Sequence, residues 1–226
     1  MNLQDIKGSY DVIVSLGSAC NPAMLLKQHN LRRFSGPLDW CVSNSLSDVS
    51  RLLKNRFEGF MEIENMCLLD ETNYFLNDGD PIYPGDEPTT PIKAYWVKDT
   101  YYNVISMHDF PVLPNQDWTV TYPSYKEKLN RRINRFLEKI TNSQSVLFVR
   151  WAASYNQAVE LHSVLSRIVK GRFTILILCP VNDLQNISEV NWGIDRVCAV
   201  EVPNKPFDNS TWEYVLNGIT LTIENQ

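Results

Sequence analysis

An alternation of apolar strands and helices in the last third of the chain constrains the fold most strongly. Short apolar runs at 145–150, 173–178 and 195–202 are typical of strands that are buried on both faces. A helix is predicted between the first two runs, over 156–170, with Gly171 at its end. Strands of this kind that alternate with helices favour a largely parallel sheet with helices on both faces. We therefore predict an α/β fold.

The N-terminal stretch repeats this pattern and holds the first candidate for chemistry. Residues 12–16 predict a strand, Gly17 interrupts it, and a helix is predicted to about His29. Ser18 is a suitable cap for that helix, and Cys20 would lie in its first turn. There the unpaired amides and the positive end of the helix dipole favour a thiolate over a thiol.

Two other interpretations of this turn stay open. Free cysteines are among the most buried residue types and usually act as small hydrophobic side chains. The amides at a helix start also suit a phosphate group. The stretch carries only Gly17, and it matches neither G-x-G-x-x-G nor G-x-x-x-x-G-K-[ST], so it lacks a nucleotide fingerprint.

Two further candidates stand at predicted strand ends, where open α/β folds place their chemistry. A strand predicted over 101–107 delivers His108, which is placed to act as a base or is an ordinary hydrogen-bonded histidine. Arg150 ends the strand at 145–150 and suits a substrate anion or a carboxylate partner. Asp39, between apolar neighbours, is either a solvent-facing turn residue or a buried acid with a dedicated partner.

The length of 226 residues predicts one domain over 1–226. Helices are also predicted at 47–54 and 125–140, where apolar residues follow helical spacing. The segment at 57–99 has turn signals and many aromatic residues but little periodicity. It is predicted to be a loop-rich insertion that serves as a lid or as an interaction surface.

The composition excludes several classes of protein. The formal net charge of −5 argues against a nucleic-acid partner, and no apolar run is long enough to span a bilayer. The polar N-terminus lacks a secretion signal, so a cytoplasmic location is expected. Five cysteines without a C-x-x-C pair disfavour a disulfide framework and a structural zinc site. We predict no metal and no cofactor.

Several segments together resemble a known family. They are VSLGSAC at 14–20, FSGPLDW at 34–40, HDF at 108–110, RRINRF at 131–136 and VLFVR at 146–150. Over roughly residues 10–180 the chain resembles a bacterial family of unknown function that is described as papain-like cysteine peptidases. The resemblance implies that Cys20 is a nucleophile and His108 its base. It also implies a papain-like α+β fold, which is the alternative to α/β.

The leading hypothesis is a cysteine-dependent hydrolase or acyltransferase that acts on a small-molecule, peptide or glycan-derived acyl or amide substrate. Cys20 would attack the acyl carbon and His108 would move the proton. An acid would orient His108, and Asp39 is the first candidate, with Asp109 and Asp183 as competitors. Ser18 and Arg150 would contact the substrate.

A binding or group-transfer module that holds an anionic ligand, such as a sugar phosphate, is the alternative. A third hypothesis is an interaction protein that uses the aromatic segment at 57–99. The catalytic hypothesis carries a geometric condition. The strands at 12–16 and 101–107 should run parallel in one sheet, so that Cys20 and His108 face one crevice at hydrogen-bond distance or one side-chain rotation from it.

Overall fold

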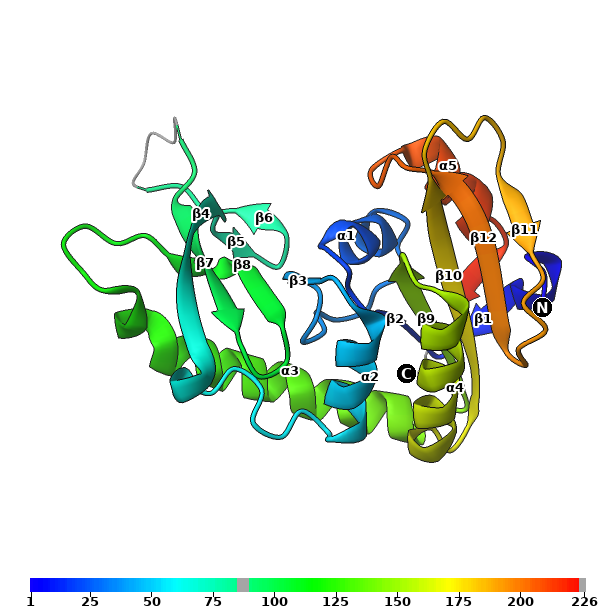
Figure 1. Ribbon diagram of the computed structural model, residues 1–226, viewed down its shortest axis with the longest axis horizontal. Helices are drawn as coiled ribbons and strands as arrows, with labels where there is room; N and C mark the ends of the chain where they lie inside the picture. Colours follow the sequence, from blue (N-terminus) through cyan, green and yellow to red (C-terminus); the bar gives the residue numbers. More distant parts are fainter. Residues whose placement is uncertain (85–89, 224–226) are drawn as a thin grey trace.

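A five-stranded sheet is the centre of the computed structural model, which describes residues 1–84 and 90–223 (Figure 1). The strand order is β11-β12-β10-β9-β2. Four neighbours are parallel, and they are β2 (Val12–Ser15), β9 (Ser145–Trp151), β10 (Arg172–Val181) and β12 (Val197–Pro203). The edge strand β11 (Ser188–Val190) is antiparallel to β12. The predicted α/β fold is confirmed.

Helices cover both faces of this parallel sheet. On one face lie α1 (Asn21–Gln28) and α5 (Asn209–Leu216). On the other lie α2 (Leu46–Lys54), α3 (Tyr122–Asn142) and α4 (Tyr155–Ile168). Along β9, Val146 and Phe148 pack with the second group, whereas Leu147 and Val149 pack with the first. Because successive side chains of a strand point to opposite faces, an unbroken apolar run is what a doubly covered strand requires.

A second sheet is entirely antiparallel, in the order β3-β8-β7-β4. Its strands are β3 (Cys41–Ser43), β4 (Met66–Tyr74), β7 (Lys93–Asp99) and β8 (Val104–Pro111). The prediction that the strand before His108 joins the parallel sheet is therefore wrong. Only residues 100–103 connect β7 to β8, and a connection this short makes a hairpin, because a parallel crossover needs a dozen residues or more.

The segment at 57–99 is more regular than predicted. It supplies β4 and β7, and between them a small hairpin of β5 (Leu76–Asn77) and β6 (Asp80–Pro81). Asp78 and Gly79 join this hairpin with φ values of 51° and 95°, as a two-residue turn with both central residues left-handed demands. Residues 85–89 of the segment lie outside the described residues.

The two sheets share one core. A single cluster of buried side chains contains Val97 and Phe110 from the antiparallel sheet and Phe148 and Ile175 from the parallel sheet. Helix α3 runs beneath both sheets and joins them along its length (Figure 1).

The ends of the described chain pair with each other. Strand β1 (Gly8–Tyr10) runs parallel to β13 (Ile219–Leu221), and this pair lies outside the main sheet. Short 3₁₀ helices occupy Gln4–Ile6, Ile63–Asn65 and Trp118–Thr121. Among the described residues, no helix is long and apolar enough to cross a membrane.

Candidate functional site

The turn that follows β2 is left-handed at two successive residues. Gly17 has a φ of 77° and Ser18 a φ of 87°, a conformation that glycine adopts freely and serine does not. Ser43 of β3 fixes this turn, because its hydroxyl accepts from the Ser18 amide at 3.2 Å and its own amide donates to the Ser18 carbonyl at 3.0 Å. The turn therefore links the two sheets.

The Arg150 side chain stabilises the same turn by hydrogen bonds to Leu16 and Ser43. Its Nη1 donates to the Leu16 carbonyl at 2.9 Å and to the Ser43 hydroxyl at 2.7 Å. Its Nη2 donates to the Ser43 carbonyl at 2.6 Å, and its Nε to the Ala152 carbonyl at 3.2 Å. The side chain is fully buried and, among the described residues, has no carboxylate partner. The geometry gives Arg150 protein partners in place of the predicted substrate contact.

Cys20 stands directly before α1, as its N-cap residue, so it takes the place predicted for Ser18 and does not lie in the first helical turn as predicted. The thiol is partly exposed, and within the described chain no other residue hydrogen-bonds to its sulfur. Burial raises the pKa of Cys20, with a hydrogen bond from its own backbone amide opposing the effect. The expectation of a resting thiolate is therefore corrected: the free protein holds Cys20 as a thiol at neutral pH.

His108 lies inside β8, not at its end, and is 5% exposed. Its Nδ1 is 2.7 Å from the Tyr74 carbonyl. Because a carbonyl only accepts, Nδ1 must carry the hydrogen, which leaves Nε2 with the free lone pair in the neutral ring. Nε2 is buried without a partner in the described part of the chain. Burial lowers the pKa of His108, opposed by the Tyr74 carbonyl and Asp109, so the imidazole is neutral at neutral pH and its Nε2 lone pair is free.

Asp39 is a buried acid with a dedicated partner, but this partner is not His108. Its carboxylate accepts from Arg32 at 2.7 Å and from the Gly36 amide at 2.8 Å. Arg32 also pairs with Asp78 of the β5–β6 hairpin at 3.0 Å. Burial raises the pKa of Asp39, and Arg32 opposes that effect. Asp39 thus anchors the hairpin to the chain before β3.

The two competing acids do not pair with His108 either. Asp109 pairs with Lys128 at 2.8 Å and Arg132 at 3.4 Å, both on α3. Asp183 follows the carboxyl end of β10, the middle strand of the five-stranded sheet. Within the described residues, none of the three carboxylates hydrogen-bonds to His108.

Cys20 and His108 come from different sheets, contrary to the parallel arrangement that was predicted. In the described structure neither side chain hydrogen-bonds to the other, and neither contributes to the other's pKa shift. Trp40 packs edge-on against His108, with 6.3 Å between ring centroids. It also lines the cleft beside α1. Trp40 is therefore the side chain that connects His108 to that cleft.

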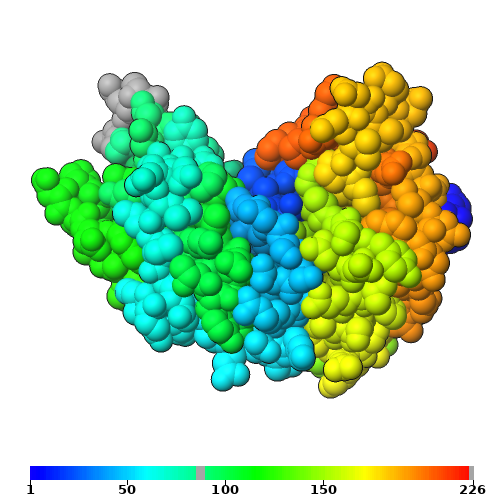
Figure 2. Space-filling view, in the orientation of Figure 1, coloured from blue at the N-terminus to red at the C-terminus, as the bar shows by residue number. Residues whose placement is uncertain are grey.

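This cleft has a volume of about 450 Å³ and lies between the two sheet regions. Figure 2 shows the hollow, with the N-terminal residues (blue) at its floor. Met24 and Leu25 of α1 form one wall, Trp40 and Gly79 another, and Phe207 before α5 a third. Lys27 ties α1 to the hairpin by an ion pair with Asp80 at 3.1 Å. The helix that Cys20 begins therefore lines a largely apolar cleft.

Sequence reasoning missed several residues of this site. Ser43 carries no motif, and its role arises only because β3 meets the turn at 17–18 in space. Phe207 is 54% exposed although it is a large aromatic side chain, and only coordinates place it at the cleft. Trp40 does carry a signal, since it belongs to the segment at 34–40 that bears the family resemblance.

The fold and the turn define a class of protein: an α/β protein with a partly exposed cysteine at the start of a helix whose later residues line a cleft. A protein family described as "Putative papain-like cysteine peptidase (DUF1796)" matches residues 11–179. The chain belongs to this family, because the match covers well over half of it.

One relative is a viral protein. "Uncharacterized protein R408" of Acanthamoeba polyphaga mimivirus is 26% identical over 226 residues, which cover 91% of this chain and 96% of the relative. The bacterial origin that the resemblance suggested is not confirmed by this relative. No solved structure matches the chain significantly.

Proposed function

We propose that the protein is a cysteine-dependent hydrolase or acyltransferase with Cys20 as its nucleophile. The position of Cys20 carries this proposal: a partly exposed thiol at the start of α1, on a turn that Ser43 and Arg150 hold from two sides. Membership of a family described as cysteine peptidases supports it. An apolar cleft beside α1 supplies a place for a substrate.

The chemistry would begin with transfer of the Cys20 proton to a base. The thiolate sulfur then forms a bond to the acyl carbon, and the carbonyl oxygen becomes an oxyanion. Amides of the first turn of α1 lack acceptors within the helix and can stabilise that charge. The leaving group departs with the proton from the base, which leaves a thioester. Water completes a hydrolysis, and another nucleophile completes an acyl transfer.

His108 is the proposed base. Its neutral ring has a lone pair on Nε2, and the bond to the Tyr74 carbonyl fixes the tautomer that a base needs. Transfer from Cys20 requires that Nε2 reach the sulfur when a substrate is bound, and Trp40 is the neighbour of His108 that lines the cleft. Arg150 and Ser43 are positioning residues in this scheme, since they hydrogen-bond to the turn that leads to Cys20.

Acyl trapping tests the nucleophile. The protein is mixed with p-nitrophenyl acetate, p-nitrophenol release is followed, and the acetyl adduct is located by peptide mass spectrometry. We expect the adduct on Cys20, and we expect Cys20→Ser to abolish both signals. Cys67→Ser is the matched control, because Cys67 is also partly exposed but lies on β4. Equal acetylation of wild type and Cys20→Ser would refute a Cys20 nucleophile.

One observation favours a second function, non-covalent binding of an anion. Arg150 places a buried cation beneath the turn from which the α1 amides project, and among the described residues no carboxylate neutralises it. A sugar phosphate would suit that site. In this case inorganic phosphate should raise the melting temperature of Cys20→Ala as much as that of wild type.

A further inference from the structure

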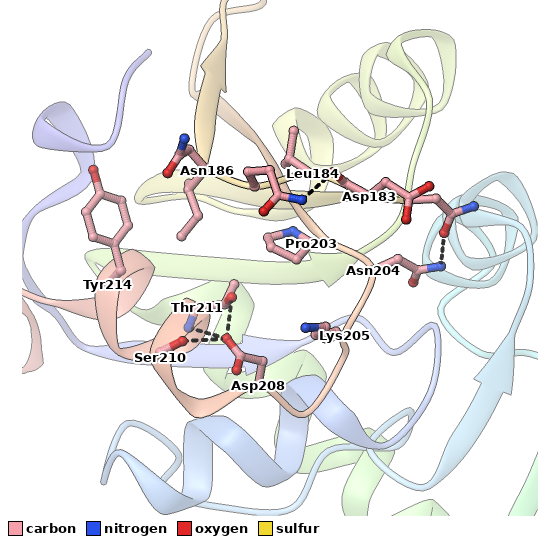
Figure 3. A pocket seen from close by; sticks show the side chains of 13 residues that line it. Asp183, Leu184, Asn186, Pro203, Asn204, Lys205, Asp208, Ser210, Thr211 and Tyr214 are labelled. Carbon is pink, nitrogen blue, oxygen red and sulfur yellow. Dashed lines mark hydrogen bonds between the residues drawn. The ribbon is translucent and has the colours of Figure 1, made fainter.

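A second cavity, of about 970 Å³, lies at the carboxyl ends of β10 and β12. Its walls are the connection after β10 at 182–187, the connection after β12 at 203–208, and the exposed side of α5 (Figure 3). The carboxyl ends of parallel strands are where open α/β sheets bind their ligands. None of the sites discussed above occupies this cavity.

The lining is polar and partly pre-organised. Asn204 donates to the side-chain oxygen of Asn182 at 2.9 Å, which fixes both carboxamides (Figure 3). Asp208 accepts from the Thr211 amide at 2.8 Å and from the Ser210 hydroxyl at 2.7 Å. These hydrogen bonds lower the pKa of Asp208 to about 2, so it is charged at physiological pH and occupies the N-terminus of α5.

Three side chains in the cavity are left for a ligand. Among the described residues, no hydrogen bond or ion pair engages the Asp183 carboxylate, the Lys205 ammonium or the Tyr214 hydroxyl. The Tyr214 side chain, 58% exposed, offers a ring as well as a hydroxyl. The cavity therefore combines an acceptor, a donor, two fixed carboxamides and one aromatic surface.

The charges and hydrogen-bonding groups of the lining indicate which class of ligand fits the cavity. One lysine faces two carboxylates, and Asp208 already caps α5, so a phosphate would meet net negative charge. An apolar chain would leave the carboxamides and charges without partners. A ligand with many hydroxyl groups satisfies all of them, because each hydroxyl donates and accepts, and a sugar ring also has an apolar C–H side for Tyr214. We propose that this cavity binds a neutral saccharide.

The saccharide site is separate from the proposed thiol chemistry but adjacent to it. The 203–208 connection forms one wall of the cavity, and its Pro206 carbonyl accepts from Asn21 of α1 at 3.3 Å. A saccharide bound here would lie behind the loop that carries Phe207 into the cleft. Binding does not require Cys20, so the two proposals can fail independently.

Saturation-transfer NMR tests the site on the full chain, with maltose, lactose and N,N′-diacetylchitobiose as probes. At least one probe should bind wild type and Cys20→Ser equally. Binding should weaken about tenfold in Tyr214→Ala and in Asp183→Asn, which keeps the left-handed conformation (φ 59°) that asparagine tolerates. Tyr83→Ala is the matched control, an exposed tyrosine outside the cavity, and should bind like wild type.

Three results with wild type and the cavity variants, and one with the control, would overturn the saccharide site. They are no saturation transfer from any of the three probes, unchanged binding in both Tyr214→Ala and Asp183→Asn, or displacement of the saccharide by inorganic phosphate. Loss of binding in Tyr83→Ala would equally place the saccharide elsewhere on the molecule. If a saccharide binds wild type and Cys20→Ser equally but wild type is not acetylated on Cys20, the saccharide site stands and the proposal of a Cys20 nucleophile is rejected.

Discussion

The two sheets of this protein differ in how deeply their strands are buried and in where they carry the candidate residues. In the parallel sheet every residue of β9 is buried, and helices cover both faces. In the antiparallel sheet β4 has no buried residue, and this sheet packs on α3 through β8. Turns that carry Cys20, Asp183 and Asn204 follow the parallel strands at one edge, whereas His108 lies within a strand. The candidate residues of the parallel sheet therefore lie in the loops after its strands, whereas the candidate base of the antiparallel sheet lies inside a strand.

This difference between the sheets explains why the candidate nucleophile is exposed and the candidate base is buried. Cys20 follows the end of a strand and is partly exposed, and Tyr214 on α5 is exposed, so both are accessible before any motion. His108 is buried, and burial sets its pKa and its tautomer. The proposed catalysis joins an accessible nucleophile from one region to a shielded base from the other.

The largest expected effect is at Arg150, which joins the two regions. Arg150→Met removes the donors for the Leu16, Ser43 and Ala152 carbonyls in a site that is fully buried. Unsatisfied buried acceptors cost about 1–3 kcal/mol each, so we expect a loss of about 4 kcal/mol in the free energy of unfolding, measured in urea. Arg131→Ala, which removes an exposed ion pair with Glu127, should cost less than about 0.5 kcal/mol. Equal urea midpoints for Arg150→Met and Arg131→Ala would contradict the conclusion that Arg150 stabilises the contact between the two sheets.

The buried Arg32–Asp39 pair comes next. Asp39→Ala leaves the buried Arg32 with Asp78 as its one carboxylate partner among the described residues, and breaking such a pair costs about 3 kcal/mol. Asp80→Ala, which removes the exposed pair with Lys27, is the control and should cost less than about 0.5 kcal/mol. If Asp39 instead orients His108, its loss would change the pH profile of acylation and leave stability nearly unchanged.

Gly17 gives a smaller effect. A Cβ there would have to adopt a φ of 77° and would lie 3.2 Å from the Ser43 hydroxyl and 3.3 Å from the Leu38 carbonyl. We expect Gly17→Ala to lower the free energy of unfolding by about 2 kcal/mol. Gly193→Ala shares the left-handed backbone but, in the described part of the chain, has open space around its Cβ, so about 1 kcal/mol is expected there. The difference measures crowding alone.

The smallest effect is the pH dependence that His108 adds to stability. Its pKa is lowered in the folded protein, so the unfolded chain takes up the proton first as the pH falls. The contribution is complete above the ordinary histidine pKa of about 6.5 and is lost as the pH falls through the lowered value. The melting temperature of wild type should therefore fall more steeply with acidification than that of His108→Gln. If the melting temperatures of the two proteins fall equally with acidification, His108 is not buried as a neutral imidazole.

The parallel sheet could be predicted because its signal is local. Runs that are apolar on both faces, such as 145–150 and 173–178, lead to doubly covered strands with little influence from the rest of the chain. The hairpin before His108 was missed for a local reason too. The Asp99 side chain accepts from the Tyr101 and Tyr102 amides at 2.8 Å each and builds a turn where a strand was predicted to begin.

The candidate site was only partly predictable. Cys20 stands at a helix start, as the glycine and proline around it indicate. Its raised pKa, however, depends on burial, which no spacing reveals. The partners of Arg150 and Asp39 depend on β3 and the β5–β6 hairpin approaching from the second sheet. Such contacts between distant segments cannot be inferred from residue types alone.

The pH–rate profile of acetylation by p-nitrophenyl acetate tests most directly whether the two regions act together. We predict that the Cys20 acetylation rate of wild type rises with the deprotonation of His108, below the ordinary histidine pKa of about 6.5. His108→Gln should lower the rate at pH 7 by about 10²–10⁴-fold. It should leave only a slow reaction that rises as the Cys20 thiol itself ionises, above the usual thiol range. An unchanged rate and profile in His108→Gln would contradict the Cys20–His108 pair.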